Sequence, residues 1–487
     1  MKNESVICSA SLAALLLGSC QKEEPINPNI LFILVDDMQS DAIASLGNKD
    51  TYTPHIDGLM DSGMVFTRTY TNGALCGALS MPSRAMLMTG RGVFGVQSDG
   101  MKIPASQVTL PEYLRHNGYR TFATGKWHAD YASFARSFSE GDNIFFGGMH
   151  PYEQNGHCNP RLHHFDPTGK YDEAPFVGQD FSSKMFADAA IEFLRSTEKD
   201  KTPFMAFVSF TSPHDPRNVL PDYGKKYVPS ELSVPANFLP EHPFDNGELT
   251  VRDEMVLPAP RTAVQLQNEL ALYYGMVSEV DVQIGRVMDA LKAAGKLEHT
   301  IIVFASDNGL AMGQNGLIGK QSLYDHSVGV PMAIVVPGKT VRKGRSDALC
   351  YLYDLYPTLC ELAGFDIPES VTGKSLLPVL KGEKAQVRND LFLAYSNQQR
   401  GIISGKYKYI IYNVEGKITE QLFDLEKDPG ELTNLVTELP EKKQELHNLL
   451  MKRMEENRDF CDLKNPLWWK DGHKLTWDEL INLYIYE

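Results

Sequence analysis

Four short and nearly continuous apolar runs dominate the hydrophobic pattern of this chain. They cover residues 29–35, 118–124, 204–210 and 300–305. A run without alternation of polar and apolar positions is typical of a strand that is buried on both faces of a parallel sheet. The pattern therefore predicts a parallel sheet at the centre of the protein.

Between these runs, apolar residues recur with the period of an α-helix. The clearest helical stripe consists of Val277, Val280, Ile284, Val287 and Leu291. Gly295 follows it at the place where a helix C-terminus is expected. Alternating strands and helices predict an α/β fold with a doubly wound, mostly parallel sheet.

Polar residues that suit chemistry follow each of the four runs. In open α/β sheets, ligands bind beyond the carboxyl ends of the strands. We therefore expect these residues to lie together at one edge of the sheet. They are Asp36 and Asp37, Lys126 and His128, His214 and Asp215, and Asp307 and Asn308.

Three carboxylates and one amide among these residues form a candidate metal site. A single Asp at a strand end is more often a loop acid or a helix cap. Here Asp36 and Asp37 follow one strand, and Asp307 and Asn308 follow another. A set of ligands made only of oxygen favours calcium or magnesium over zinc.

A helix start carries the candidate nucleophile. Ser80 stands where an N-cap is expected, Pro82 falls in the first turn, and Gly90 lies where the helix would end. A helix N-terminus suits an anionic group, so Ser80 and Arg84 could attack and hold a tetrahedral oxyanion there. An ordinary amphipathic helix with a serine cap would show the same local pattern.

Composition narrows the class of substrate. The chain has 487 residues, 43% of them hydrophobic, which suits one large domain and a smaller one. Its formal net charge of −15, without a Lys/Arg-rich block, argues against a nucleic-acid partner. An acidic enzyme that acts on an anionic substrate must gather its positive charges in one pocket.

The first 20 residues have the features of a targeting segment. A short apolar run over residues 11–17 precedes Leu17-Gly18-Ser19-Cys20, which looks like the lipobox of bacterial lipoproteins. We expect cleavage before Cys20 and acylation of that residue, although a simple secretory peptide would also fit. A lipid anchor would place the protein in the periplasm, or at the outer membrane or cell surface, of a Gram-negative anaerobe.

The segment Ser80-Met81-Pro82-Ser83-Arg84, with Thr89-Gly90-Arg91 after it, resembles the signature of type I sulfatases. In that family a maturase oxidises the first residue of the signature to formylglycine, whose hydrate is the nucleophile. The resemblance implies that Ser80 is this residue and that the maturase is of the serine type. Cys76 has the wrong spacing to Pro82 for this role. The resemblance covers nearly the whole chain after the leader and implies an alkaline-phosphatase-like sheet.

The resemblance also implies a role for each charged residue at the sheet edge. Arg84 and Lys126 would steady the formylglycine hydrate, and His214 and Lys320 would bind sulfate and assist the departing alcohol. His128 would take the proton that releases sulfate.

The same resemblance implies a proton acceptor and further ligands at the metal site. Asp307 could accept a proton from the formylglycine hydrate. The cation, Ca²⁺ rather than Mg²⁺, would also bind the matured Ser80 side chain and a sulfate oxygen.

The end of the chain resembles the C-terminal subdomain of sulfatases, which has a small antiparallel sheet and one packed helix. We expect a catalytic domain over residues 26–380 and an α+β subdomain over residues 381–487, with its helix over residues 441–454. Its strands are expected near residues 391–395, 401–404 and 407–413. Trp468, Trp469 and Trp477 are expected to pack against the catalytic domain.

The long segments 130–180 and 217–261 are candidates for a sugar pocket, because long loops inside a compact domain are usually functional. Asp215 and Arg217, next to His214, are the best candidates for contacts to sugar hydroxyls.

The leading hypothesis is a calcium-dependent, exo-acting sulfatase for a sulfated glycan, with galactose or N-acetylgalactosamine sulfate as the suggested unit. One alternative is a phosphatase, or a phosphonate or phosphodiester hydrolase, of the same superfamily. Another is an inactive lipoprotein that only binds glycans.

Overall fold

The structure is a computed structural model that describes residues 27–96, 100–338, 341–459, 461, 469–470 and 473–474. The expected lipobox at Cys20 lies outside these residues, and so do Trp468, Trp477 and the side chain of Trp469.

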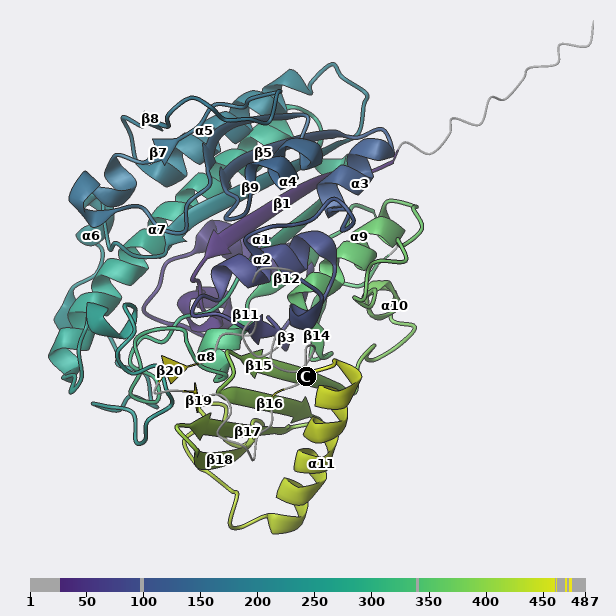
Figure 1. Cartoon of the computed structure of the whole chain (residues 1–487). Coiled ribbons are helices and arrows are strands. Elements are labelled where there is room, and N and C mark those ends of the chain that lie inside the picture. Colours follow the sequence, from purple (N-terminus) through teal and green to yellow (C-terminus); the bar gives the residue numbers. More distant parts are fainter. Residues whose placement is uncertain are drawn as a thin grey trace, which may run out of the picture.

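An eight-stranded sheet forms the centre of the molecule (Figure 1), with strand order β13-β2-β12-β10-β1-β9-β5-β6. Neighbouring strands from β10 to β6 are parallel, whereas β12 runs antiparallel to both β10 and β2. All four predicted strands lie in the parallel part, so the predicted fold class is confirmed. The strands are β1 (Asn29–Asp36), β2 (Met64–Phe66), β5 (Arg120–Lys126), β6 (Glu140–Phe145), β9 (Phe204–Pro213), β10 (Thr300–Ser306), β12 (Met332–Val335) and β13 (Gly344–Ser346).

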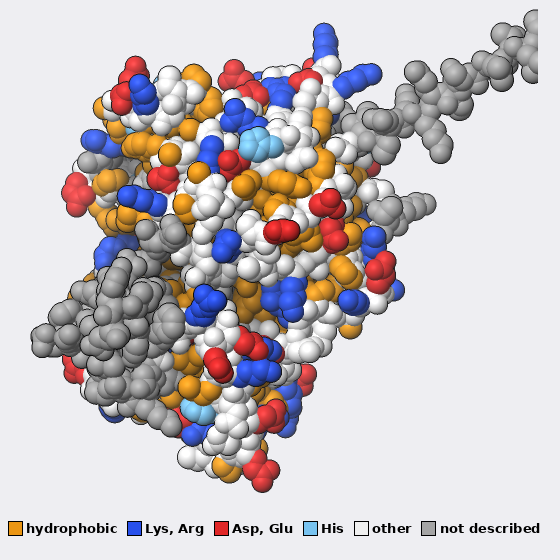
Figure 2. Space-filling view, turned by 45° about the vertical axis from the view of Figure 1, so that its right-hand side comes forward, with side chains coloured by type: hydrophobic (Ala, Val, Ile, Leu, Met, Phe, Trp, Pro, Cys, Tyr) orange, Lys and Arg blue, Asp and Glu red, His pale blue; other side chains and the backbone are white. Residues whose placement is uncertain are grey.

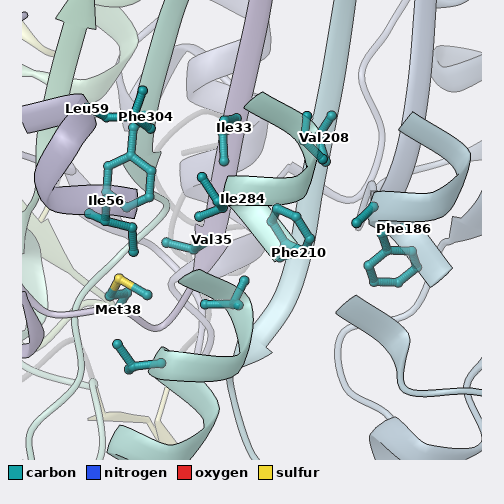
Figure 3. Packing of buried hydrophobic residues seen from close by; sticks show 14 of the residues in the cluster. Ile33, Val35, Met38, Ile56, Leu59, Phe186, Val208, Phe210, Ile284 and Phe304 are labelled. Carbon is teal, nitrogen blue, oxygen red and sulfur yellow. The ribbon is translucent and has the colours of Figure 1, made fainter. Parts of the chain in front are cut away.

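Helices cover both faces of this sheet, and strand β1 shows why its run is continuously apolar. Its odd-numbered residues, such as Ile33, pack in a cluster with Ile284 and Phe186 (Figure 3). Its even-numbered residues, such as Phe32, pack in a second cluster with Leu87. Both faces of the strand are therefore buried, as a parallel sheet requires.

The first cluster receives residues from α1 (Pro54–Ser62), α5 (Ser182–Ser196) and α7 (Ala263–Ala293). The second receives residues from α2 (Ser80–Thr89), α3 (Leu110–His116), α4 (Tyr131–Ser137), α9 (Leu355–Leu362) and α10 (Leu377–Leu380). Helix α7 begins with a capping box between Thr262 and Gln265. The helix ends just before Gly295, whose φ of 68° confirms the predicted stop.

A second, five-stranded sheet has the order β18-β17-β16-β15-β4. The antiparallel strands are β15 (Asp390–Tyr395), β16 (Gln399–Ser404), β17 (Tyr407–Val414) and β18 (Lys417–Asp424), with α11 (Pro440–Glu456) packed beside them (Figure 1). Strand β4 (Gly73–Ala74) joins β15 in parallel and comes from the segment that leads into α2. The predictions missed β4 because two residues carry no strand pattern.

The remaining elements are short. They are the sheet β11 (Gly329–Val330), β3 (Thr69–Tyr70) and β14 (Cys350–Tyr351), the pairs β7 (Arg161–Leu162) with β8 (Phe176–Val177) and β19 (Trp469–Lys470) with β20 (His473–Lys474), and the helices α6 (Pro221–Gly224) and α8 (Asp325–Val328).

Among the described residues, no helix combines the length and the hydrophobicity that a membrane span requires. The face shown in Figure 2 carries acidic and basic side chains that are mixed rather than gathered into one basic patch.

Candidate active site

Helix α2 presents Ser80 from its first turn. Ser80 was expected at the N-cap, but this prediction is wrong, because Leu79 is the N-cap and Ser80 is the first helical residue. The Ser80 hydroxyl caps no backbone group, since it turns toward side chains from other elements. Pro82 lies in the first turn, and Gly90 ends the helix in the left-handed region with φ of 63°. Both of these predictions are confirmed.

The Ser80 hydroxyl is the point where four segments meet. Its Oγ lies 3.1 Å from Asp36 Oδ1 and 2.9 Å from Asn308 Oδ1. Lys320 Nζ donates to the same oxygen at 3.3 Å. Ser80 is only 2% exposed, so these contacts are made out of bulk water.

The acids come from two neighbouring parallel strands. Val35 on β1 pairs with Ser306 on β10, so Asp36 and Asp307 leave the sheet side by side. Asn308 Nδ2 donates to Asp37 Oδ1 at 2.7 Å. Asp37 has φ of 63°, a left-handed conformation that a non-glycine residue adopts at some cost and that is frequent at functional sites.

Each of the three carboxylates is paired with a cation. Lys126 Nζ lies 2.5 Å from Asp36 Oδ2, and Lys320 Nζ lies 2.6 Å from Asp37 Oδ1. Arg84 Nε lies 2.8 Å from Asp307 Oδ2. None of these side chains is more than 4% exposed.

Burial and neighbouring charge shift the pKa values of this cluster. Burial alone would raise the pKa of Asp36, but Lys126 and other nearby cations hold it well below its usual value. Burial, together with the charge of Asp36, raises the pKa of Asp307 to about 6. Burial lowers the pKa of Lys126, whereas the pKa of Lys320 is raised because the attraction of Asp37 and other acids outweighs burial.

Two histidines face the same cavity in different electrostatic settings. His214 Nε2 lies 3.5 Å from Asp37 Oδ2, and its Nδ1 lies 3.1 Å from Asp215 Oδ1. Burial acts to lower the pKa of His214, but Asp37 and other acids raise it overall. Burial and the charge of Lys126 keep the pKa of His128 well below its usual value. His128 is therefore neutral near pH 7.

Gly148 makes room for the ring of His128. A Cβ at position 148 would lie 2.7 Å from His128 Nε2, so a side chain there would displace the histidine. His128 itself has φ of 65°.

Four of these groups, Ser80, His128, His214 and Lys320, line a cavity of about 270 Å³. Its lining residues are Gly77, Ala78, Ser80, His128, Gly148, Met149, His214, Val251, Arg252, Asp253, Lys320 and Gln321. A larger cavity of about 440 Å³ is lined by residues such as His55 and Thr300, at the start of β10, and contains none of these chemical groups. Size alone would have selected yet another cavity, of about 760 Å³, which is lined by residues such as Arg195 and Arg286.

The structure brings together most of the residues that the sequence suggested, but two of them, Arg217 and Asp215, do not line the cavity. Arg217 donates to the Pro213 carbonyl oxygen at 2.5 Å and lies over the Tyr273 ring, so it does not line the cavity. Asp215 contacts His214 and Arg252 and stands behind the cavity wall. The sugar-binding roles of Asp215 and Arg217 stay predictions.

Sequence reasoning missed the three other polar or charged side chains of the cavity wall, namely Arg252, Asp253 and Gln321. Arg252 and Asp253 lie within the long segment 217–261, which was expected to contribute to a sugar pocket, but no motif marks them there. Gln321 follows Lys320 directly, and this proximity was the available signal.

The chemistry of the site fits a hard divalent cation. Donor atoms of Asp36, Asp37 and His214 lie within 4.8 Å of one another. Oxygens of Asp307 and Asn308 lie close by. Asp307 Oδ1 accepts from the Asp37 backbone N–H at 3.3 Å, and Asn308 Oδ1 lies 2.9 Å from Ser80 Oγ. Several buried carboxylates so close together repel one another, and a divalent cation would relieve that repulsion.

Comparison with known proteins agrees with this geometry. Residues 28–365 match the family model described as Sulfatase. The chain belongs to the sulfatase family. Residues 313–459 also match the model described as N-sulphoglucosamine sulphohydrolase, C-terminal. The resemblance inferred from the Ser80 signature is thus confirmed, and the protein is an enzyme of this family.

One relative of this sulfatase is the N-acetylglucosamine-6-O-sulfatase of Bacteroides thetaiotaomicron, which is 28% identical over 98% of this chain and 95% of its own. A solved structure in complex with its substrate D-glucosamine-2-N,6-O-disulfate is 24% identical, with a TM-score of 0.72, over 89% of this chain and 98% of its own. The phosphonate monoester hydrolase of Agrobacterium radiobacter is also 24% identical, with a TM-score of 0.70, over 88% and 96% of the two chains. These two structures show the shared fold.

Proposed function

We propose that this sulfatase removes sulfate from a single sugar unit at the end of a sulfated glycan, with a nucleophile made from Ser80. The observation that carries the proposal is the convergence of Asp36, Asn308 and Lys320 on the Ser80 hydroxyl at the inner end of a cavity. The relative named as an N-acetylglucosamine-6-O-sulfatase supports a glycan substrate.

The size of the cavity supports exo action. At about 270 Å³ it lies below the roughly 300–1,000 Å³ of pockets that bury drug-sized ligands, so it suits one sugar rather than several. Galactose or N-acetylgalactosamine sulfate was the unit suggested by the sequence, whereas the relative is named for N-acetylglucosamine. A substrate panel must therefore include both sugar types.

Asp36, Asp37, Asp307 and Asn308 would hold Ca²⁺. The ion would polarise a sulfate oxygen and favour the deprotonated nucleophile. Oxidation of Ser80 to formylglycine by a serine-type maturase would supply the hydrate that attacks sulfur.

The residues of the chain then have separate tasks. Lys320 and His214 bind the sulfate oxygens from one side of Ser80. Asp215 accepts from His214 Nδ1 and Asp37 lies beside Nε2, so the two carboxylates raise the pKa of His214 and favour the doubly protonated ring, whose Nε2 proton passes to the departing alcohol. His128, neutral because its pKa is low, accepts the proton whose removal releases sulfate. Arg84 holds Asp307 in place and leaves Nη2 without a hydrogen-bond partner among the described residues.

The chain would reach its substrate as a lipoprotein. Acylation at Cys20 would anchor it to a membrane of a Gram-negative anaerobe, in the periplasm or at the cell surface. Globomycin, which blocks lipoprotein signal peptidase, should leave the unprocessed precursor; normal processing in its presence would exclude this anchor.

The direct test is turnover by protein co-expressed with a serine-type maturase, after mass analysis of the Ser80 peptide. We expect an aldehyde at position 80 and hydrolysis of aryl sulfate in preference to aryl phosphate and phosphonate esters. Preferential phosphonate hydrolysis would favour the activity of the Agrobacterium radiobacter enzyme instead. An unmodified serine without turnover on a panel of sulfated sugars would favour a protein that only binds glycans.

A further inference from the structure

Lys320 reaches Ser80 from a loop that has no regular structure of its own. The loop covers residues 307–324, between β10 and α8, and the structure describes all of this segment without a helix or strand in it. Lys320 Nζ lies 2.6 Å from Asp37 Oδ1 and 3.3 Å from Ser80 Oγ. Because such a loop has no hydrogen-bond ladder of its own, its buried backbone groups need partners from other segments.

The carboxylate of Glu254 supplies such partners just before Lys320. Gly319 donates its backbone N–H to Glu254 Oε1 at 2.8 Å, and Ile318 donates its backbone N–H to the same carboxylate at 3.2 Å. Glu254 is only 4% exposed, so these hydrogen bonds are shielded from bulk water. A charged acceptor makes strong hydrogen bonds, and this one holds two successive N–H groups of the chain that leads into Lys320.

Arg261 holds the other side of that carboxylate. Arg261 Nη2 lies 2.6 Å from Glu254 Oε2, and Arg261 Nη1 donates to the Gly316 carbonyl oxygen at 2.7 Å. Arg261 is 3% exposed and directly precedes Thr262, the N-cap of α7. We call Glu254 and Arg261 the loop clamp. The clamp fixes the Lys320 loop to the start of α7 at two places.

The space around Gly319 shows how closely the loop and the clamp approach each other. A Cβ at position 319 would lie 3.0 Å from Glu254 Oε1 and 2.8 Å from Gln321 Oε1. Gln321 Oε1 accepts the Lys320 backbone N–H at 3.0 Å, and Gln321 Nε2 donates to Asp253 Oδ2 at 2.6 Å. The backbone N–H groups at 319 and 320 are therefore held, directly or through Gln321, by residues 253 and 254.

We infer that Glu254 and Arg261 are positioning residues, which set the place of the Lys320 ammonium beside Ser80 without touching the substrate. Neither of them lines the active-site cavity. The inference rests on the proposed sulfatase function, in which Lys320 binds a sulfate oxygen. Its consequence is large, because a misplacement of about 1 Å at a reacting group can cost on the order of 10²-fold in rate.

The test is Glu254→Gln in the matured enzyme with calcium. The amide keeps the size of the side chain, but its NH₂ group must face either Arg261 or a backbone N–H. We expect KM for aryl sulfate and the inhibition constant of inorganic sulfate each to rise about tenfold, and kcat/KM to fall about 10²-fold. A variant that merely lowered the fraction of folded enzyme would reduce kcat and leave KM and the inhibition constant unchanged.

Asp354→Asn is the matched control, because Asp354 is a buried carboxylate with a similar set of partners. It pairs with Arg388 and accepts backbone N–H groups from Tyr351 at 2.9 Å and from Lys374 at 2.7 Å. None of these residues lines the active-site cavity. The control should lose stability but keep the wild-type KM and the wild-type inhibition constant of sulfate.

Gly319→Ala is a second variant, which keeps both charges of the clamp. Its Cβ would push the loop away from Glu254, so KM and the inhibition constant should rise in the same direction by about threefold. This variant decides the question if Glu254→Gln does not fold.

Unchanged KM and inhibition constant in the folded Glu254 variant, or in the Gly319 variant where the former does not fold, would overturn the inference. An equal rise in the Asp354 control would also overturn it. In each case the wild type still hydrolyses aryl sulfate, so the proposed function stands. If the matured wild type hydrolyses no sulfate ester, the proposed function fails and the inference fails with it.

Discussion

Two clusters of buried charge in this protein consist of similar ion pairs, but only one of them encloses a reactive group beside a cavity. In the active site, the pairs made by Lys126, Lys320 and Arg84 enclose a hydroxyl that opens to a cavity. The second cluster consists of Lys408, Asp325 and Glu431, and we call it the junction cluster. Lys408 on β17 lies 2.7 Å from Asp325 and 2.8 Å from Glu431, and its side chain is fully buried.

The junction cluster links parts of the chain rather than activating a group. Asp325 begins α8 of the catalytic part, and Lys408 belongs to the C-terminal sheet. Tyr70 Oη donates to Asp325 Oδ2 at 2.9 Å, and burial together with Asp325 raises the pKa of this phenol well above its usual value. The phenol stays protonated and is no nucleophile. Buried ion pairs therefore mark a catalytic site only where they converge on a reactive group.

The strongest test of this contrast is Ser80→Ala. Removal of the Ser80 hydroxyl, on which Asp36, Asn308 and Lys320 converge, should lower kcat/KM by about 10⁴-fold or more, because the proposed nucleophile is lost. Thermal unfolding should change little, and Ser62→Ala at the exposed end of α1 should leave activity intact. Substantial residual turnover by the Ser80 variant would contradict nucleophilic catalysis at this position.

Metal removal is expected to have the next largest effect. Exhaustive chelation should abolish turnover and lower the unfolding temperature, because buried carboxylates would again repel one another. Calcium should restore both, and isothermal titration should show one strong site. Asp36→Asn should weaken that site. Full activity of metal-free protein would remove the ligand role from Asp36, Asp37, Asp307 and Asn308.

The junction cluster should respond in stability and not in chemistry. Lys408→Met leaves Asp325 and Glu431 without their buried cation, and should lower the free energy of unfolding by about 3–5 kcal/mol. Lys406→Met removes the exposed partner of Asp424 and should lower the free energy of unfolding far less, because exposed ion pairs stabilise little. Denaturant unfolding measures both, and kcat of the folded Lys408 variant should match the wild type. A Lys408 variant that loses kcat but keeps its stability would show that the junction cluster contributes to catalysis.

The smallest expected effect concerns the pH dependence of stability and comes from a buried carboxylate outside both clusters. Burial raises the pKa of Glu279 on α7 from 4.5 to about 7. The folded state therefore binds more protons than the unfolded state between these pH values, and this group lowers stability as pH rises from 4.5 to 7.

Glu279→Gln should remove this fall in the free energy of unfolding, because glutamine does not ionise. The variant should gain about 3 kcal/mol relative to wild type at pH 8 and almost nothing at pH 4. Chemical unfolding at several pH values measures the difference. A gain that is independent of pH would show that Glu279 is charged or neutral to the same extent in both states.

The sequence pattern predicted the central strands and most site residues for clear reasons. Both faces of β1 are buried, so its run is apolar throughout and easy to recognise. Residues at strand ends meet because parallel strands deliver them to one edge, as Asp36 and Asp307 show. The local pattern failed at β4 and at the N-cap of α2, where partners from distant segments decide the conformation.

By itself, the sequence determined the fold class, the family and the Ser80 signature, because periodicity and short motifs are local properties of the chain. Only the tertiary structure decided that Ser80 turns away from its helix, that Arg217 lies outside the cavity and that Arg252 bridges Asp215 and Asp253. These facts depend on contacts between residues that are far apart in the chain. Loop side chains take their directions from such contacts, so no periodic pattern can encode them.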